Sequence, residues 1–155
     1  MGLYFMIFTR ILRNYLLKIG NSFYARTAKN FGQAERFIST PGPLSIDNTL
    51  VANKICQGEF FISGNTVQLE NRVIWDHSLK NIENYEELHG FTWLDDLAAR
   101  GDNTAIDIAQ KWIFSWIEKY GSGSGSGWTP NLTGRRLIRL IHHQEIILRK
   151  LSEKK

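Results

Sequence analysis

Apolar residues recur every three or four positions over most of this 155-residue chain, which is the spacing of one face of an α-helix. The first such stretch predicts a helix over about residues 3–31. A basic amphipathic helix of this kind can lie on a membrane surface or pack on its own domain, and the sequence leaves both open. The predicted apolar stripe is Leu3, Ile7, Ile11, Tyr15 and Leu16, with Arg10, Arg13 and Lys18 off it.

A second helical region begins near residue 82 and continues to residue 120. Its first part ends at Arg100-Gly101, and Asp102 is a suitable N-cap for the part that follows, because its carboxylate can accept from a free backbone N–H. Two helices joined by so short a connection run antiparallel, as an αα-hairpin. The predicted stripes are Tyr85, Leu88, Phe91, Leu94 and Ala98, then Ala105, Ile108, Ala109, Trp112, Ile113, Trp116, Ile117 and Tyr120.

A glycine- and serine-rich segment over 121–127 precedes the last predicted helix, over 133–151. We interpret this segment as a loop between consecutive helices that delivers Trp128, and a linker between separate domains is the alternative. Thr133 is the predicted helix cap. The predicted apolar side of the last helix is Leu137, Leu140, Ile141, Gln144, Leu148 and Leu151.

Shorter elements are predicted between the long helices. "STPGPLS" over 39–45 breaks any helix, because proline lacks the N–H that a helix interior needs. Residues 47–56 predict a short helix with Asp47 as its N-cap. Residues 71–81 have no clear period and are expected to be irregular.

The one strand signal lies in "GEFFISGNTVQLE". Two short runs, Glu59–Ser63 and Thr66–Glu70, flank Gly64-Asn65, a dipeptide that suits a tight turn. The predicted fold class is therefore mainly α, with a small β-hairpin near 59–70.

The composition is that of a globular protein, with 43% hydrophobic and 22% charged residues, which excludes wholesale disorder. The single cysteine, Cys56, excludes an internal disulfide and a cysteine-based zinc cluster, and we expect a small buried thiol. No positive charge precedes the first apolar run, and Arg10 and Arg13 interrupt it, so it is neither a good signal peptide nor a bilayer span. A cytoplasmic or membrane-peripheral location is favoured, and the periplasm stays open.

The charge is unevenly distributed along the chain. Residues 1–36 carry 6 basic against 1 acidic residue, residues 37–120 carry 6 against 12, and residues 121–155 carry 7 against 2. Basic ends can bind an anionic membrane, an anionic polysaccharide or nucleic acid, or pair with the acidic middle of the same fold. Charge alone does not choose among these.

Few residues point to chemistry. His142 and His143 are adjacent, so on a helix they diverge by about 100° and cannot easily share a metal ion. The neighbouring carboxylates Asp95 and Asp96 diverge likewise, and we expect a solvated face rather than a glycosidase pair. We predict no catalytic residue in the chain, no metal site and no cofactor.

One candidate binding surface remains, on the last helix. Arg135, Arg139, His142 and Arg149 follow one another at steps of four, three and seven, and Trp128 precedes them. Guanidinium groups bind carboxylate and sulfate oxygens, and an exposed indole offers a flat face to a sugar ring. The substrate-binding candidates are therefore Trp128, Arg135, Arg139 and His142. In the equally weighted alternative, Trp128 fills the hairpin and the arginines pair with acidic residues of 83–107.

The segments "LHGFTWLDDLAARGD" (88–102) and "GWTPNLTGRRLIRLIHH" (127–143) resemble the N-terminal region of heparinase II/III-like polysaccharide lyases, in the form common in alphaproteobacteria. "GEFFISGNTVQLE" fits the segment before them. The resemblance covers nearly all of residues 40–150. It lies in signatures of the family, and these are not catalytic motifs.

This resemblance implies an incomplete (α/α) toroid of antiparallel helical hairpins, followed in complete members by a β-sandwich domain. Those lyases cleave uronate-containing anionic glycans by β-elimination. The resemblance places their reacting Asn or His, Tyr and His beyond this chain, so no catalytic role carries over. We therefore divide the chain into a basic helical segment, 1–38, and a partial toroid domain, 39–155.

The leading hypothesis is a truncated lyase segment that is inactive alone and whose partner is an anionic, uronate-containing polysaccharide. Uncovered aliphatic side chains on the last helix predict self-association. Peripheral membrane contact through residues 1–30 is also predicted, and nucleic acid is not expected as a partner. The alternative hypothesis is a non-enzymatic helical adaptor that binds a membrane surface or nucleic acid through its basic ends.

Overall fold

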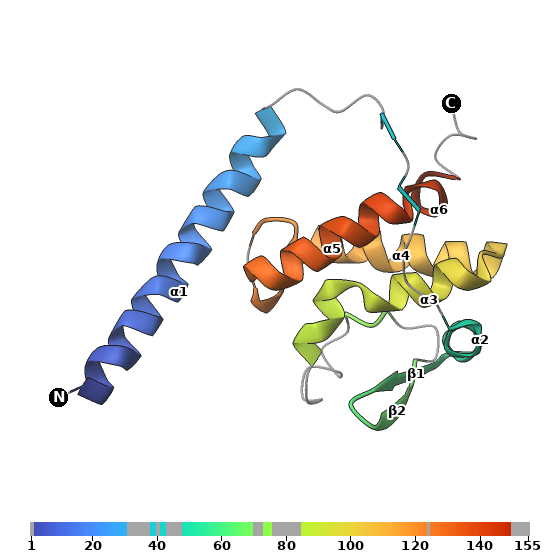
Figure 1. Cartoon of the computed structure of the whole chain (residues 1–155), viewed down its shortest axis with the longest axis horizontal. Helices are drawn as coiled ribbons and strands as arrows, with labels where there is room; N and C mark the ends of the chain where they lie inside the picture. Colours follow the sequence, from blue (N-terminus) through green and yellow to red (C-terminus); the bar gives the residue numbers. More distant parts are fainter. Residues whose placement is uncertain are drawn as a thin grey trace.

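A long first helix lies beside a body of shorter helices and one β-hairpin (Figure 1). The computed structural model describes residues 2–30, 38–39, 41–42, 48–69, 73–75, 85–123 and 125–149. Helices make up 74% of them, so the predicted mainly α class with a small hairpin is confirmed. The α-helices are α1 (Gly2–Thr27), α2 (Thr49–Cys56), α3 (Thr92–Arg100), α4 (Asn103–Tyr120), α5 (Pro130–His142) and α6 (Gln144–Leu148); the strands are β1 (Glu59–Ile62) and β2 (Asn65–Gln68); 3-10 turns are η1 (Ala28–Asn30), η3 (Tyr85–Gly90) and η4 (Ser126–Trp128).

The αα-hairpin forms as predicted. α3 ends at Gly101, in the left-handed region (φ 62°), and α4 begins at Asp102, whose carboxylate accepts from the Ala105 amide at 2.9 Å. α3 and α4 pack on each other and run in opposite directions (Figure 1). The predicted stripe of α4 is largely buried, but Ile117 is exposed and Ile106, outside the stripe, is fully buried.

Aromatic side chains dominate the core of the body. Trp75, Trp93, Trp112 and Trp116 are buried together with Phe91. They meet mostly edge to face, as the quadrupoles of aromatic rings favour. The indole of Trp75 donates to the backbone oxygen of Trp112 at 2.6 Å, which satisfies its one polar group inside the core.

The hairpin differs from its prediction by one residue at the turn. β1 pairs antiparallel with β2, and Ile62 stands opposite Asn65. The two turn residues are therefore Ser63 and Gly64, both with positive φ (48° and 82°), and not Gly64-Asn65. A type I′ hairpin turn needs positive φ at both central residues, and serine occupies the first here at some steric cost.

The short helix α2 begins at Thr49. Asn48 is its N-cap, because the Asn48 side chain accepts from the Leu50 amide at 3.0 Å, so the predicted cap Asp47 is wrong. Most of the predicted break over 39–45, and of the irregular segment 71–81, lies outside the described residues.

The helical region predicted from residue 82 is interrupted at Phe91. η3 ends at Gly90, and Phe91 takes the left-handed conformation (φ 62°, ψ 33°) before α3 starts. The strain is compensated by burial, since the Phe91 side chain is 1% exposed. The turn also exposes the Gly90 carbonyl to α5, where it accepts from Arg139 at 3.0 Å.

The last helix begins earlier than predicted and is broken. Thr129 is its cap, accepting from the Leu132 amide at 3.3 Å, and Pro130 occupies the first turn, so the predicted cap Thr133 is wrong. α5 ends at His142 and α6 follows after His143. The predicted Leu151 lies outside the described residues.

The side of α5 that faces the body coincides only in part with the apolar side that the sequence indicated. Leu132 and Arg136, outside the predicted set, are buried, and Leu140 of that set packs against the core, whereas Leu137 is 56% exposed and Ile138 is exposed beside it. An arginine faces the core because aromatic rings and carbonyls receive it there, as described below.

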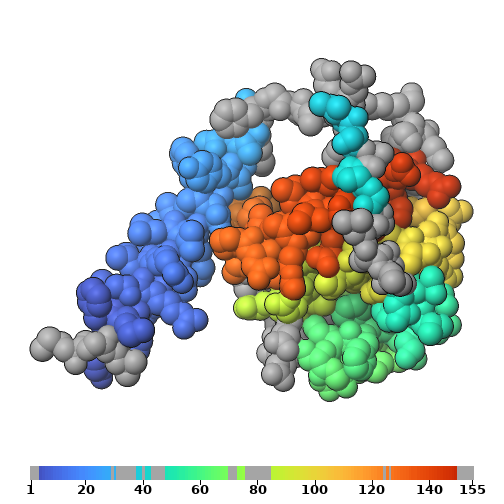
Figure 2. Space-filling view, in the orientation of Figure 1, coloured from blue at the N-terminus to red at the C-terminus, as the bar shows by residue number. Residues whose placement is uncertain are grey.

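α1 contacts the body near its C-terminal half and extends well past it at the other end (Figure 2). The Asn21 side chain donates to the backbone oxygen of Trp128 at 3.0 Å. In the described part of the chain, no helix has the length and apolar character needed to cross a membrane.

Candidate functional site

Trp128 fills a gap in the body next to α4. Its indole N–H donates to the Tyr120 backbone oxygen at 2.7 Å, and its ring centroid lies 5.6 Å from that of Trp116. The side chain is only partly exposed. Of the two alternatives that the sequence leaves open, the structure has the one in which Trp128 packs inside the hairpin. Sugar binding by Trp128 stays a prediction.

Arg136 occupies the centre of an aromatic cluster. Its guanidinium carbon lies 4.0 Å from the ring centroid of Trp116 and 5.1 Å from that of Trp128. Nη1 donates to the backbone oxygens of His89 (2.8 Å) and Gly127 (3.0 Å). Among the described residues, no carboxylate pairs with Arg136. Burial lowers the pKa of Arg136 to about 10, which leaves it charged at neutral pH.

A buried histidine supports the same cluster. His89 is 1% exposed, and its Nδ1 accepts from the indole of Trp116 at 2.8 Å, which fixes the proton of the neutral ring on Nε2. The ring stacks on Trp75, with centroids 5.2 Å apart. His89, Trp116 and Arg136 thus connect η3, α4 and α5, and this cluster is part of the packed core.

Arg139, Asp95 and His143 form a second polar cluster, between α3 and α5. Asp95 accepts from Arg139 Nε at 2.6 Å and lies 2.9 Å from Nε2 of His143. The side chain of Asp95 is 16% exposed, so the predicted solvated face is wrong for this residue. Asp96 lies on another side of α3, where it accepts from the Asn48 amide at 3.3 Å.

The environment of Asp95 favours its charged form. Burial opposes ionisation, but hydrogen bonds from His143 and Arg139 and the nearby positive charge outweigh it, so the pKa of Asp95 lies below its ordinary value. Arg139 and His143 keep the Asp95 carboxylate ionised, and both are hydrogen-bonded to it. This arrangement holds α5 against α3 and does not present a free general base.

Arg135 is the exposed member of the predicted set, and Trp128, Arg139 and His142 are partly exposed. Arg135 Nη1 lies 2.5 Å from an oxygen of Glu87, and both side chains are about half exposed, at 45% and 59%. His142 is partly exposed, and its ring meets that of His143 edge to face. The structure therefore places Arg135, Arg139 and His142 along one helix, with each arginine paired to a carboxylate.

The glycine- and serine-rich segment is a loop of the body, and it holds α1. Gly121 and Gly123 continue the end of α4 through hydrogen bonds to Ile117 and Tyr120. Gly123 has φ +82°, and a Cβ there would lie 2.6 Å from the backbone oxygen of Asn21. Only a glycine at this position lets the loop and α1 approach so closely.

Asp95, Arg136 and His143 are missing from the residue set that the sequence suggested. The signal was available in part, since Leu132, Arg136, Arg139 and His143 recur at helical spacing and share one face. General rules place arginine outside the core, however, and nothing local shows that α3 supplies a carboxylate.

The described residues offer neither a metal-binding cluster nor a reactive cysteine. Among the described residues there is no group of three or more His, Cys, Asp or Glu side chains that could hold a metal ion. Cys56 is partly exposed, and burial raises the pKa of its thiol, so it lacks the lowered pKa of a reactive cysteine. The chain matches no protein-family model, no curated protein and no solved structure.

Proposed function

We propose that the chain is the N-terminal helical segment of a heparinase II/III-like polysaccharide lyase and that it contributes a binding wall for an anionic, uronate-containing glycan. One observation carries this proposal. The two segments with the resemblance, 88–102 and 127–143, lie against each other and form one unit. Arg136 reaches the backbone oxygen of His89, and Arg139 reaches that of Gly90 and the carboxylate of Asp95.

Through these contacts, residues of the two resembling segments hold the segments together. The turn at Gly90 and Phe91 directs the Gly90 carbonyl toward α5, where Arg139 donates to it, and Arg136 donates to the carbonyl of His89 just before it. A hairpin of α3 and α4 followed by α5 is the kind of unit that an (α/α) toroid repeats. The resemblance and the contacts thus support the same assignment, at the level of a folding unit.

The exposed ion pair between α5 and η3 supports glycan binding. The ion pair between Arg135 and Glu87 is half exposed, so it contributes little stability and exchanges partners at low cost. A glycan carboxylate or sulfate can take the place of Glu87 and bind the guanidinium in a bidentate manner. Arg139 differs, because its carboxylate partner is more buried and also held by His143.

We assign binding, and not proton abstraction, to these residues. Elimination next to a uronate carboxylate needs a positioned base and a neutralising group that act together. The resemblance assigns neither the base nor the neutralising group to a residue of this chain. Incubation of the chain with heparan sulfate, alginate or chondroitin should accordingly give no rise in the ultraviolet absorbance of unsaturated uronate, and steady product formation would contradict this division of roles.

Calorimetric titration with oligosaccharides of the same three glycans tests the binding. Arg135→Glu should weaken binding about tenfold, the loss of one charge-assisted contact, and Glu87→Gln should strengthen it by freeing Arg135. Lys54→Glu, an exposed charge reversal on α2, is the matched control. Absence of binding, or equal losses for Arg135→Glu and Lys54→Glu, would contradict the proposal.

A further inference from the structure

α1 exposes an apolar face of unusual size for a helix in water. Phe5, Phe8, Leu12, Tyr15 and Ile19 follow one another at steps of three and four, and Phe23 continues the row. Each of these side chains is between 45% and 70% exposed. A contiguous patch of this kind marks an interaction surface.

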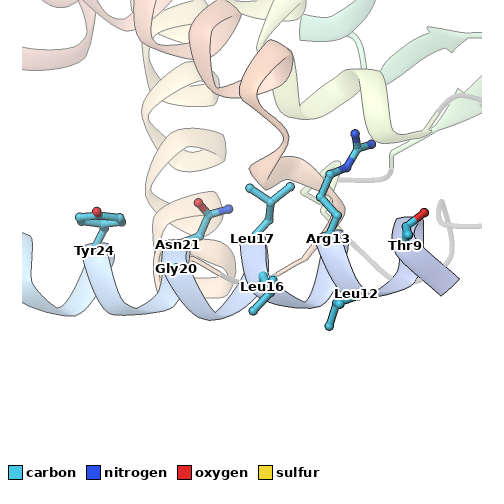
Figure 3. A pocket seen from close by; sticks show the side chains of 8 residues that line it. All are labelled: Thr9, Leu12, Arg13, Leu16, Leu17, Gly20, Asn21 and Tyr24. Atoms are coloured by element: carbon cyan, nitrogen blue, oxygen red, sulfur yellow. The ribbon is translucent and has the colours of Figure 1, made fainter. Parts of the chain in front are cut away.

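This face is turned away from the body. In Figure 3, Arg13, Leu17 and Asn21 extend from α1 toward the body, whereas Leu12 and Leu16 extend from the other side. The hollow of about 430 Å³ drawn there is lined by residues of α1 alone, so it is an open helix surface and not an enclosed site for a small molecule. Docking of α1 on the loop at Asn21 therefore leaves the apolar row uncovered.

The positive charge of α1 indicates which kind of partner binds the apolar row. The helix contains Arg10, Arg13, Lys18 and Arg26 and no acidic residue. At 100° per residue Arg10 lies opposite the row, Arg13 and Lys18 lie on its two flanks, and Arg26 lies beside its C-terminal end. A helix with a row of aromatic and aliphatic side chains flanked by cations lies in the plane of a membrane interface. We propose that α1 binds the surface of a bilayer with anionic headgroups through the row Phe5–Phe23.

Two other occupants fit less well. A second α1 would bring four cations against four with no acidic residue on either helix to offset them. Nucleic acid would use the cations but leave the aromatic row in water, because phosphate contacts dominate its binding. An anionic bilayer is the one partner that receives both features.

This proposal is independent of glycan binding. It rests on α1, whereas the glycan wall lies on α5, and the two are tested by different variants. Failure of one experiment therefore leaves the other standing.

Flotation with vesicles tests the membrane proposal on the full chain. Vesicles of phosphatidylcholine alone are compared with vesicles of equal parts phosphatidylcholine and phosphatidylserine. The wild type should float with the anionic vesicles only, and added salt should release it. Phe8→Glu/Ile19→Glu should abolish flotation, and Arg13→Glu/Lys18→Glu should weaken it more than tenfold, since each basic residue near an anionic surface contributes about fivefold in affinity.

Phe61→Glu is the matched control, because Phe61 on β1 is as exposed as the row on α1 (62%). It should leave flotation unchanged, and circular dichroism confirms that each variant retains its helices. Three results would overturn the proposal: no flotation of the wild type, equal binding to neutral and anionic vesicles, or variants of α1 that change the sedimenting mass or duplex DNA binding while flotation stays the same.

Discussion

The guanidinium carbon of Arg136 lies 4.0 Å from the ring centroid of Trp116, at the point where α4 and α5 meet η3. A buried positive charge is costly unless its hydrogen-bonding groups are satisfied and its surroundings are polarisable. Here two backbone oxygens and the faces of aromatic rings provide both. The hydrogen bond from Arg136 to the His89 oxygen joins the two segments on which the assignment depends, and the ring contact with Trp116 joins α5 to α4.

Replacement of Arg136 should destabilise the body strongly. Arg136→Ala leaves two buried carbonyls without a donor and opens a cavity, with an expected loss of about 2–4 kcal/mol. Arg136→Lys keeps the charge but loses the planar fork, with a loss of roughly 1–2 kcal/mol. Urea unfolding followed by tryptophan fluorescence measures both.

The neighbouring arginine provides the control for that experiment. Arg135→Ala removes an exposed ion pair on the same helix and should cost about 0–1 kcal/mol. Equal losses for Arg135→Ala and Arg136→Ala would show that the aromatic cluster does not hold α5 to the body.

Stability should fall in acid through Asp95. Because the folded pKa of Asp95 is depressed, its contribution is fully present above the ordinary aspartate value of 3.8 and is lost as the pH falls through the folded value. The stability advantage of the wild type over Asp95→Asn should thus shrink below about pH 4. Urea midpoints across pH 7 to about 3 check this. Glu118→Gln, an exposed change on α4, is the control, and a difference independent of pH would refute the role of Asp95.

Gly123 should control the docking of α1. Gly123→Val places a branched side chain against the backbone of Asn21 and in a positive-φ conformation, so α1 should separate from the loop. Hydrogen exchange at residues 20–24 should rise while exchange in α4 stays slow. Gly134→Ala, where a Cβ meets nothing within 4 Å, should instead stabilise α5 by about 0.5–1 kcal/mol. Unchanged exchange in Gly123→Val would mean that the loop does not hold α1.

Self-association through α5 remains a prediction, and the structure shows which large aliphatic side chains of α5 are exposed. Leu137 and Ile138 are exposed side by side, at 56% and 55%. Leu137→Lys/Ile138→Lys should lower the average mass in sedimentation over a concentration series, since apolar contact drives such association. A wild type that stays monomeric at every concentration would contradict the prediction.

Local signals predicted the elements whose ends are set by their own sequence. The α3–α4 connection is the clearest case, because Gly101 supplies the left-handed end of one helix and Asp102 caps the next. The hairpin was found for the same reason, with an error of one residue at Ser63. Helix α1 was found from its period alone.

Features set by contacts between distant segments could not be predicted. The spacing of Leu88, Phe91 and Leu94 continues a helix without a break, yet Phe91 turns to bury its ring and free the Gly90 carbonyl for α5. The inward Arg136 likewise depends on aromatic rings from three other segments. Residue-type rules place arginine in water, so the buried position of Arg136 on α5 was not predicted.

Residues 88–102 and 127–143 form one unit, and its α5 face is proposed to bind a uronate-containing glycan. Titration of the ¹⁵N-labelled chain with heparan sulfate, alginate and chondroitin oligosaccharides, followed by NMR, tests it most directly. With at least one of these glycans, saturable shift changes should concentrate at Arg135, Arg139 and His142 and at the Trp128 indole. Shifts confined to α1, or no saturable shifts with any of the three glycans, would contradict the account.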